Sequence, residues 1–563
     1  MSSTLAPEIK SERNPISEKD VVKALESLNL RPKPEDVPHL TNLLTGIWEV
    51  WDKVDQMDDY VPEVNEKRFP RKDVHRPEGQ DNAGNAWAWK CDVRDQSPSG
   101  EGKGLLAGKT LSLKDNIALK GVPCLLGTDI FQDWTPNMDA TVVTRILEAG
   151  GVIKGKAVCE NLSAWAVSCS AATGPISNAW ASGFSAGGSS SGSGYLIAKG
   201  ECWGGLGGDQ GGSIRIPSSA NGLVGMKPTF GLVPYTGIAS LEPTLDHTGP
   251  MTRTVLDNAL LLQAVAGADG VDDRQLAGCP FPDSVPDYPA LAQQGVKGLR
   301  VGIIKESLDR PLHDPRVSAL VVKAAKVFET LGCVVEEVSV PMHADAPDIW
   351  AVPGRLSVYK SLVGEAGGRR GHCMNDLTEK MLPIDQEKYD KMWCAYKNWM
   401  VNGRWGWDHL PKPGQLLGKA TNLTRKLRDE YYKALGQYDV LITPTMPLLP
   451  PKLPAEGASI KELMVNSAGA SLNTSAFNIV GYPRDVTFFF SLLFQWMNTI
   501  LTRLILQTGL PALSLPVGFL PSLVEPHPKL PVGMQIVSKL YHEATIYRVA
   551  YAWEQAVDWK DFS

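Results

Sequence analysis

The spacing of hydrophobic residues divides the chain into a helical start and a longer region in which strands and helices alternate. Two runs near the N-terminus repeat at helical spacing: Val21, Val22, Leu25 and Leu28, then Leu40, Leu43, Leu44, Ile47, Trp48 and Trp51. Ser17 and Asp20 have the pattern of a helix N-cap, and Pro32 ends the first run. The sequence therefore predicts a helical N-terminal region over residues 1–70 and a polar linker or arm over 71–104.

The pattern changes after residue 105. Strand-like runs at 300–304 and 333–340 flank a helical run that starts at Asp314-Pro315, and another helix is predicted after Asp139. Units of this kind predict an α/β fold with a mixed, largely parallel central sheet that helices cover on both faces. We expect this main domain to span 105–555, with a helical insertion at 365–425 that covers the sheet.

Composition narrows the classes of function. The 563 residues are 43% hydrophobic and 21% charged, with a net charge of −6, so there is no basic surface for nucleic acid. The nine cysteines are scattered without Cys-x-x-Cys pairs, which predicts a reduced, cytoplasmic chain without a metal site. The first 20 residues are polar and lack the apolar core of a secretory signal.

Two glycine-rich regions are candidates for chemistry. Residues 104–110 approach a phosphate-binding loop, but only three residues separate the glycines, and the strand-like run 111–114 follows where a helix is required. The segments SAGGSSSGSG (185–194) and GGLGGDQGGSIRIP (204–217) lie inside an apolar α/β region, which argues against a flexible linker. Successive amide N–H groups in such turns can bind an anion or a developing oxyanion.

These segments resemble the amidase signature family. AGGSSSGS (186–193) and GGDQGGSIRIP (207–217) follow SLKDN (112–116) in the order and at the spacing of that family. The likeness continues through GLVGMKPTFGLVPYTG (222–237) and LPVGMQIV (530–537). The forms GGDQGGSIRIP and GLVPYTG are similar to the branch of bacterial and fungal amidases that includes enantioselective, nitrile-pathway enzymes.

The resemblance implies a catalytic serine–serine–lysine arrangement. It assigns the nucleophile to Ser213, the proton relay to Ser189 and the base to Lys114, with a cis peptide bond between Gly188 and Ser189. A serine hydroxyl needs a base to become a strong nucleophile, and burial can hold a lysine neutral for that purpose. Ser191 stands where the family often has glycine, a departure expected to affect loop flexibility.

The same comparison assigns supporting roles around the nucleophile. The backbone N–H groups of Gln210, Gly211, Gly212 and Ser213 would form the oxyanion hole. Asp209 and Arg215 would brace the loop. The implied activity is hydrolysis of carboxylic amides to acid and ammonia, with no cofactor and no metal.

Other interpretations stay open at this point. The same acyl-enzyme serves an esterase or carbamate hydrolase, and an inert amidase-like binding subunit is the alternative from another class. A nitrilase would need Cys159, Glu160 and Lys156 to be completed by further motifs, which the sequence lacks. His247 reads as a structural histidine. The expected partner is a small-molecule amide, with a homodimer as a further alternative.

An apolar segment interrupts the resemblance. Removing roughly 484–511 would leave GYPALSLPVG, a continuous reading similar to the family, so 484–508 is interpreted as an insertion. It is barely long enough to span a membrane. A membrane anchor, a lid over the pocket and translated intron sequence are the three origins considered, and a membrane partner is expected only for the first.

Overall fold

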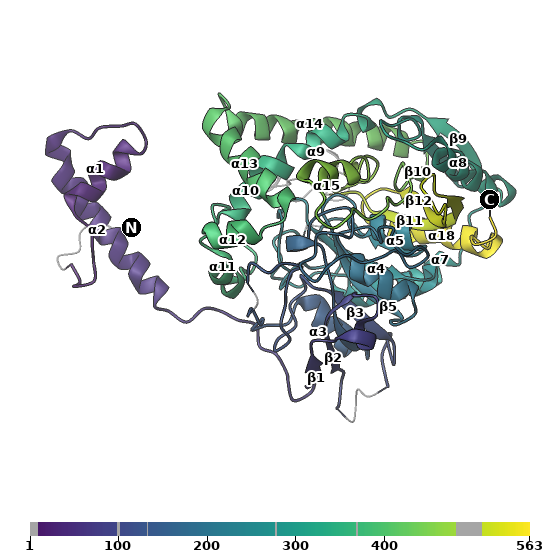
Figure 1. Ribbon diagram of the computed structural model, residues 1–563, viewed down its shortest axis with the longest axis horizontal. Helices are drawn as coiled ribbons and strands as arrows, with labels where there is room; N and C mark the ends of the chain where they lie inside the picture. The colour runs from purple at the N-terminus through teal and green to yellow at the C-terminus, as the bar shows by residue number, and fades with distance from the viewer. Residues whose placement is uncertain are drawn as a thin grey trace, which may run out of the picture. The chain divides into compact units, whose positions relative to one another are not determined.

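The chain forms two compact units, Met1–Pro62 and Glu63–Ser563. The computed structural model in Figure 1 describes residues 10–97, 102–131, 133–275, 278–367, 370–479 and 509–562. The first unit contains helices α1 (Glu18–Glu26) and α2 (Val37–Asp55). The Ser17 N–H and hydroxyl both donate to the Asp20 carboxylate at the start of α1. The two runs of helical spacing thus form helices, but their unit ends at Pro62.

The predicted linker at 71–104 is instead largely part of the second unit's sheet. Strand β1 (Arg71–His75) pairs antiparallel with β2 (Trp87–Val93), and β2 pairs with β4 (Val152–Ala157). Strand β1 has the polar sequence RKDVH, which gives no hydrophobic alternation that would predict a strand. It lies at the edge of the sheet, where hydrogen bonds to β2 on one side hold it. The linker prediction was therefore wrong for both strands.

The second unit is built around one twelve-stranded mixed sheet of order β1-β2-β4-β3-β5-β7-β6-β11-β12-β10-β8-β9. The remaining strands are β3 (Thr110–Lys114), β5 (Gly204–Asp209), β6 (Val224–Lys227), β7 (His247–Thr252), β8 (Arg300–Ile304), β9 (Val334–Val338), β10 (Val440–Pro444), β11 (Ala512–Pro521) and β12 (Lys529–Val537). The pairs β3–β4, β3–β5, β8–β10 and β8–β9 are parallel. The other described pairs are antiparallel, so the sheet is mixed as predicted but less parallel than expected.

Helices cover the sheet on both faces. The main core packs strands against α3 (Thr141–Glu148), α6 (Val255–Val265), α8 (Pro315–Thr330) and α18 (Glu543–Ala556). In β3, Leu111 and Leu113 point into this core, so Ser112 and Lys114 face the other side. On that side lie α4 (Ser191–Ala198) and α5 (Arg215–Asn221), with α4 against β3 and β5.

The predicted insertion at 365–425 is helical. Residues 365–425 contain α11 (Asn375–Met381), α12 (Gln386–Lys391), α13 (Cys394–His409) and the first part of α14 (Pro413–Leu435). Helices α9 (Ala346–Ala351) and α10 (Pro353–Leu362) precede them. Leu377, Tyr396 and Trp399 share an apolar cluster with Leu126 and Leu162, which lie in loops after β3 and β4. The residues that the structure describes also include the short α-helices α7 (Tyr288–Ala292), α15 (Ile460–Asn466) and α16 (Ala476–Ile479).

The apolar segment 484–508 lies outside the described residues. Within the ranges that the structure describes, no helix is both long and apolar enough to cross a membrane.

Candidate active site

Lys114 and Ser189 meet in the interior of the second unit. Lys114 ends strand β3, and Ser189 lies just before helix α4, after a cis peptide bond from Gly188. The Lys114 Nζ donates to Ser189 Oγ at 2.8 Å and to the Gly208 carbonyl oxygen at 3.3 Å. Both side chains are fully buried. Strand alternation thus brings a lysine that lies 75 residues earlier in the chain into contact with this serine.

The charge of Lys114 is tuned by its surroundings. Burial lowers the pKa of Lys114 to about 8, while the nearby acidic groups, Asp209 and Glu160 among them, oppose that shift. About one-tenth of Lys114 is therefore neutral at pH 7, and this fraction rises with pH. A neutral amine can accept a proton, so this lysine can serve as a base.

Ser213 stands in the turn between strand β5 and helix α5, and its side chain is half-buried. Its hydroxyl makes no hydrogen bond to any residue that the structure describes. The Ser189 hydroxyl donates to the Ser163 carbonyl oxygen at 2.5 Å. The loop before Ser189 packs on the start of α5, because a Cβ on Gly187 would lie 2.9 Å from Pro217 Cα. The two serines therefore lie on adjoining loops.

The backbone before Ser213 is held through its carbonyl groups. The oxygen of Asp209 accepts from Asn478 Nδ2 at 3.0 Å, and that of Gln210 from Trp350 Nε1 at 2.8 Å. The remaining two contacts are Thr474 Oγ1 to the Gly211 oxygen at 2.6 Å and the Ile216 N–H to the Gly212 oxygen at 2.7 Å. This segment, residues 209–213, is called the nucleophile loop below.

Three N–H groups of the nucleophile loop have no partner among the described residues: those of Gln210, Gly211 and Ser213. The Gly212 N–H is different, because it donates to Asp209 Oδ1 at 2.8 Å. The expectation that Gly212 supplies an oxyanion donor is therefore not met in this structure. Gly212 has φ +137°, and a Cβ there would lie 2.4 Å from Thr474 Oγ1, which explains the glycine.

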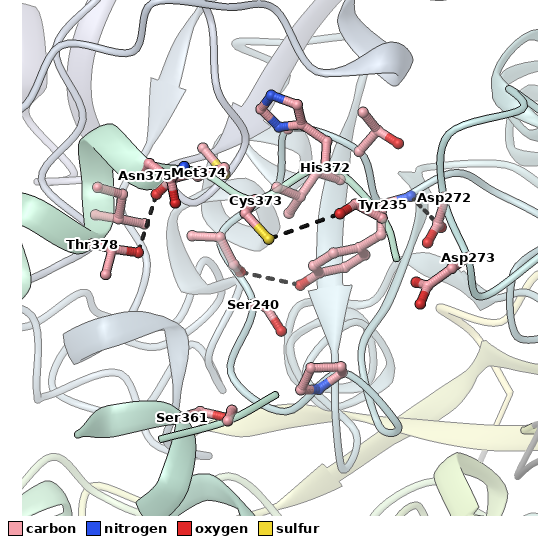
Figure 2. A pocket seen from close by; sticks show the side chains of 18 of the residues that line it. Tyr235, Ser240, Asp272, Asp273, Ser361, His372, Cys373, Met374, Asn375 and Thr378 are labelled. Carbon is pink, nitrogen blue, oxygen red and sulfur yellow. Dashed lines mark hydrogen bonds between the residues drawn. The ribbon is translucent and has the colours of Figure 1, made fainter. Parts of the chain in front are cut away.

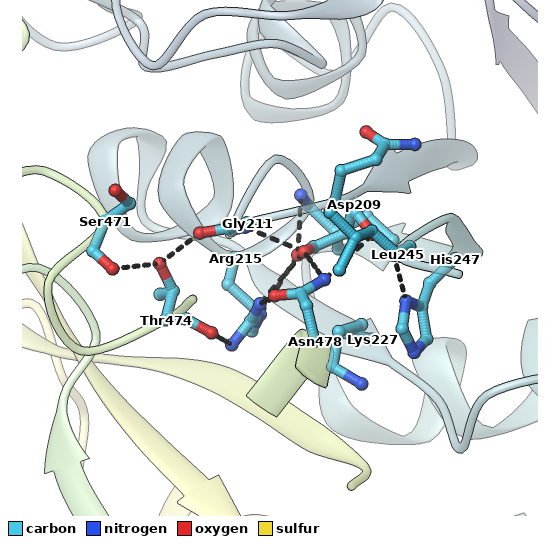
Figure 3. A network of polar contacts seen from close by, with 12 residues as sticks. Asp209, Gly211, Arg215, Lys227, Leu245, His247, Ser471, Thr474 and Asn478 are labelled. Carbon is cyan, nitrogen blue, oxygen red and sulfur yellow. Dashed lines mark hydrogen bonds and ion pairs between the residues drawn. The ribbon is translucent and has the colours of Figure 1, made fainter. Parts of the chain in front are cut away.

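A buried ion pair supports this loop (Figure 3). Arg215 donates to Asp209 through Nε at 3.0 Å and Nη2 at 2.9 Å, and both side chains are fully buried. Arg215 also reaches the Thr474 carbonyl oxygen, Gln535 Oε1 and Asn478 Oδ1 at 2.9, 2.7 and 2.7 Å. Burial alone would raise the pKa of Asp209, but the Arg215 guanidinium holds it well below its usual range. The bracing role expected for this pair agrees with these contacts.

We expect Arg215→Met to lower the free energy of unfolding by about 3–5 kcal/mol, because it leaves a buried carboxylate without its countercharge. Urea unfolding followed by circular dichroism measures this loss. Arg404→Met is the matched control, since Arg404 is 65% exposed and pairs with Asp408 on the surface of α13. An exposed pair of this kind is worth less than about 1 kcal/mol. Equal losses in the two variants would contradict the structural role of the buried pair.

Several supporting residues were missed by the sequence analysis. Trp350, Thr474 and Asn478 contact the loop from 140, 263 and 269 residues away along the chain, and nothing local marks them. Ser191 has a defined partner, since its hydroxyl donates to Glu160 Oε1 at 2.7 Å inside the protein. The Glu160 N–H in turn donates to the Ser189 carbonyl oxygen at 3.1 Å. Ser191 therefore helps to fix this region, where the sequence suggested an effect on flexibility.

A pocket of about 380 Å³ lies beside the site, between the 235–240 loop, Asp272 to Arg274 and helix α11 (Figure 2). A narrower pocket of about 50 Å³ shares Ala239, Ser240 and Leu377 with it. The narrow pocket also touches Ser163, whose carbonyl oxygen accepts from Ser189. Its other walls are mainly apolar: Leu126, Leu162, Leu241, Leu362, Met381 and Tyr396.

The remaining candidates are structural in character. Among the described residues, no group of three or more His, Cys, Asp or Glu side chains could hold a metal ion. His247 is buried, and its Nδ1 lies 2.8 Å from the Leu245 carbonyl oxygen. Burial raises the pKa of the Cys159 thiol to about 12, which leaves it protonated at neutral pH.

Comparison with known proteins agrees with the resemblance of the motifs to the amidase signature family. The family model described as Amidase matches residues 83–547. An enantioselective amidase of Rhodococcus rhodochrous is 36% identical over 460 residues, which cover 81% of this chain and 80% of that protein. One of the subunits of the glutamyl-tRNA(Gln) amidotransferase of Moorella thermoacetica is 32% identical, covering 82% and 85%.

Solved structures agree on the fold. A 6-aminohexanoate cyclic dimer hydrolase has a TM-score of 0.65 at 22% identity, covering 81% of this chain and 86% of that one. A bacterial aryl acylamidase of the amidase signature family has a TM-score of 0.64 at 22% identity, covering 81% and 84%. With its motifs, fold and most of its length in common with these proteins, the chain belongs to the amidase signature family.

Proposed function

We propose that this hydrolase of amide bonds cleaves carboxylic amides to acid and ammonia through an acyl-enzyme on Ser213. The observation that carries the proposal is the buried hydrogen bond from Lys114 to Ser189, next to a half-buried Ser213 whose loop presents unpaired N–H groups. Relatives that carry amidase names support the same chemistry. An esterase or carbamate hydrolase would use the same intermediate, and substrate competition separates these activities.

The proposed reaction has two halves. Ser213 Oγ attacks the amide carbon while its proton passes to Ser189, and the Ser189 proton passes to neutral Lys114. The oxyanion is stabilised by the N–H groups of Gln210, Gly211 and Ser213. The proton returns along the same route to the leaving amine, which departs as ammonia. Water then adds to the acyl group by the same relay, and the acid is released with Ser213 restored.

The narrow apolar pocket supports substrates with an apolar acyl group. Its walls are formed by aliphatic and aromatic side chains, and it adjoins the larger pocket at Ala239, Ser240 and Leu377, which line both. We therefore propose amides of apolar aliphatic or aryl acids as the first substrates to assay.

The proposal is tested by labelling and by product analysis. A fluorophosphonate should label the wild-type chain on the peptide that contains Ser213, as identified by mass spectrometry. Ammonia release from a panel of aliphatic, aryl and fatty amides should follow without a partner protein. A chain that is neither labelled nor active would instead be an inert binding protein. Ammonia release that appeared only with added partner proteins would contradict a hydrolase that acts on its own.

We expect kcat/KM to rise with pH through about 8, because the base is the neutral form of Lys114. Below that value the neutral fraction falls about tenfold per pH unit. The measurement is kcat/KM for an uncharged amide between pH 6 and 10, with circular dichroism to verify that the fold is unchanged. A flat profile across this range would contradict the assignment of Lys114 as the base.

A further inference from the structure

The orientation of each free N–H in the nucleophile loop depends on the carbonyl that precedes it. A peptide unit is planar, so a donor that fixes the carbonyl of one residue also fixes the N–H of the next residue, which points the opposite way. The Asn478 contact to Asp209 thus orients the N–H of Gln210, and the Trp350 contact to Gln210 orients that of Gly211.

The other two anchors act differently. The Thr474 hydroxyl fixes the plane that holds the Gly212 N–H, but that group already donates to Asp209 and is not available to a substrate. The plane that holds the Ser213 N–H is fixed by a backbone contact, from the Ile216 N–H to the Gly212 oxygen. Among the described contacts, only Asn478 and Trp350 therefore orient a free N–H through a side chain.

We propose that Trp350 is a positioning residue that aims the Gly211 N–H at the oxyanion of the reaction. This inference rests on the proposed function, and it assigns a role to a helix that no signature motif includes. Trp350 lies on α9, and its Nε1 donates to the Gln210 oxygen at 2.8 Å. The N–H it orients belongs to the residue two positions before the proposed nucleophile.

The indole ring is itself held firmly. A Cβ on Gly211 would lie 3.1 Å from Trp350 Cζ2, and a Cβ on Gly354 would lie 3.2 Å from Cζ3. The ring therefore packs between two glycines, one in the nucleophile loop and one at the start of α10. Both glycines allow this close approach, so the loop cannot shift toward α9 without meeting the ring.

Trp350 is also the anchor that can be changed cleanly. Asn478 donates to the Asp209 carboxylate at 2.8 Å and accepts from Arg215, so its replacement would disturb the buried ion pair. Trp350→Phe keeps a ring between the two glycines and removes the N–H donor. We expect kcat to fall about tenfold with KM changed less than about twofold, because oxyanion contacts act on the transition state. Loss of a whole oxyanion donor typically costs about 10²–10³-fold.

Trp407→Phe is the matched control. Trp407 Nε1 donates to the Leu356 carbonyl oxygen at 3.0 Å, a contact of the same type between α13 and α10. This variant loses the same kind of hydrogen bond without touching the nucleophile loop. We expect its kcat and KM to stay within about twofold of wild type.

A second readout separates positioning from general damage. An arylboronic acid forms a tetrahedral adduct with an active-site serine, whereas the carboxylic acid product binds without one. Trp350→Phe should raise the inhibition constant of the boronic acid about tenfold and leave that of the product unchanged. Both constants report only on folded enzyme, so their ratio stays informative if the variant is less stable.

Three results would contradict the proposed role of Trp350. A kcat for Trp350→Phe equal to that of Trp407→Phe, an effect on KM alone, or equal shifts of both inhibition constants would overturn the positioning role. Fluorophosphonate labelling of wild-type Ser213 distinguishes this failure from that of the proposed function. If wild type is labelled and turns over amides, only the assignment of Trp350 is at stake.

Discussion

Ser213→Ala is expected to lower kcat for amide hydrolysis by about five to six orders of magnitude, the scale seen when a serine hydrolase loses its nucleophile. In the proposed mechanism, alanine removes the oxygen that forms the acyl-enzyme. Ser189 is fully buried and donates to the Ser163 carbonyl oxygen. The measurement is ammonia release in single-turnover and steady-state assays.

Labelling by a fluorophosphonate should disappear in the same variant. Ser193→Ala is the control, because Ser193 is a buried serine on α4 whose hydroxyl donates to the Leu206 carbonyl oxygen at 3.4 Å. That variant should keep labelling and turnover close to wild type. Turnover by Ser213→Ala within about tenfold of wild type would exclude an acyl-enzyme on this residue.

The motifs could be read from the sequence because their chemistry is local. The turn after β5 needs glycine at 212, where φ is +137°. The ion pair that braces this turn joins Asp209 and Arg215, which are six residues apart in the chain. Lys114 was assigned from the resemblance of SLKDN (112–116) to the family, and the alternation of strand β3 places it on the face opposite Leu111 and Leu113. Spacing between motifs then identified which serine follows it.

The rest of the site is formed by contacts between residues that are far apart in the chain, which the sequence does not reveal. Trp350 and Thr474 reach the nucleophile loop from 140 and 263 residues away along the chain. A tryptophan on a short helix reads as an ordinary core residue, since neither its partner nor its direction is encoded nearby. The partner of the Gly212 N–H, the Asp209 carboxylate, was likewise not evident from the sequence.

The sequence predicts more parallel strand pairs than the sheet contains, because strand pairing depends on contacts between residues that are far apart in the chain. Strand–helix–strand units at β3–α3–β4 and β8–α8–β9 are parallel, as the pattern predicts. Between them, β5, β7, β6, β11 and β12 pair antiparallel, and their sequences contain glycine and proline that weaken the strand signal. The polar edge strand β1 carries no periodic signal, so the sequence predicts a linker at 71–104.

Lys114→Met is expected to lower kcat by about 10⁴-fold, because it removes the base while keeping the length and apolar stem of the side chain. The same variant should be at least as stable as wild type. The pKa of Lys114 falls from 10.5 to about 8 in the folded protein, a shift worth about 3 kcal/mol. At pH 7 the native state therefore carries the cost of a buried ammonium, which methionine does not.

The sign of the pH dependence makes this prediction specific. Between pH 8 and 10.5 the unfolded chain binds more protons at Lys114 than the native state, so wild-type stability rises with pH across that window. The advantage of Lys114→Met, about 1–3 kcal/mol at pH 7 once the lost contact to Ser189 is counted, should therefore shrink toward pH 10.5. Lys419→Met, on the exposed side of α14, should show no such trend in urea unfolding. An inactive Lys114→Met that is less stable at pH 7 would mean that the lysine is structural, because a lysine whose pKa is lowered by burial must weaken the fold while it is charged.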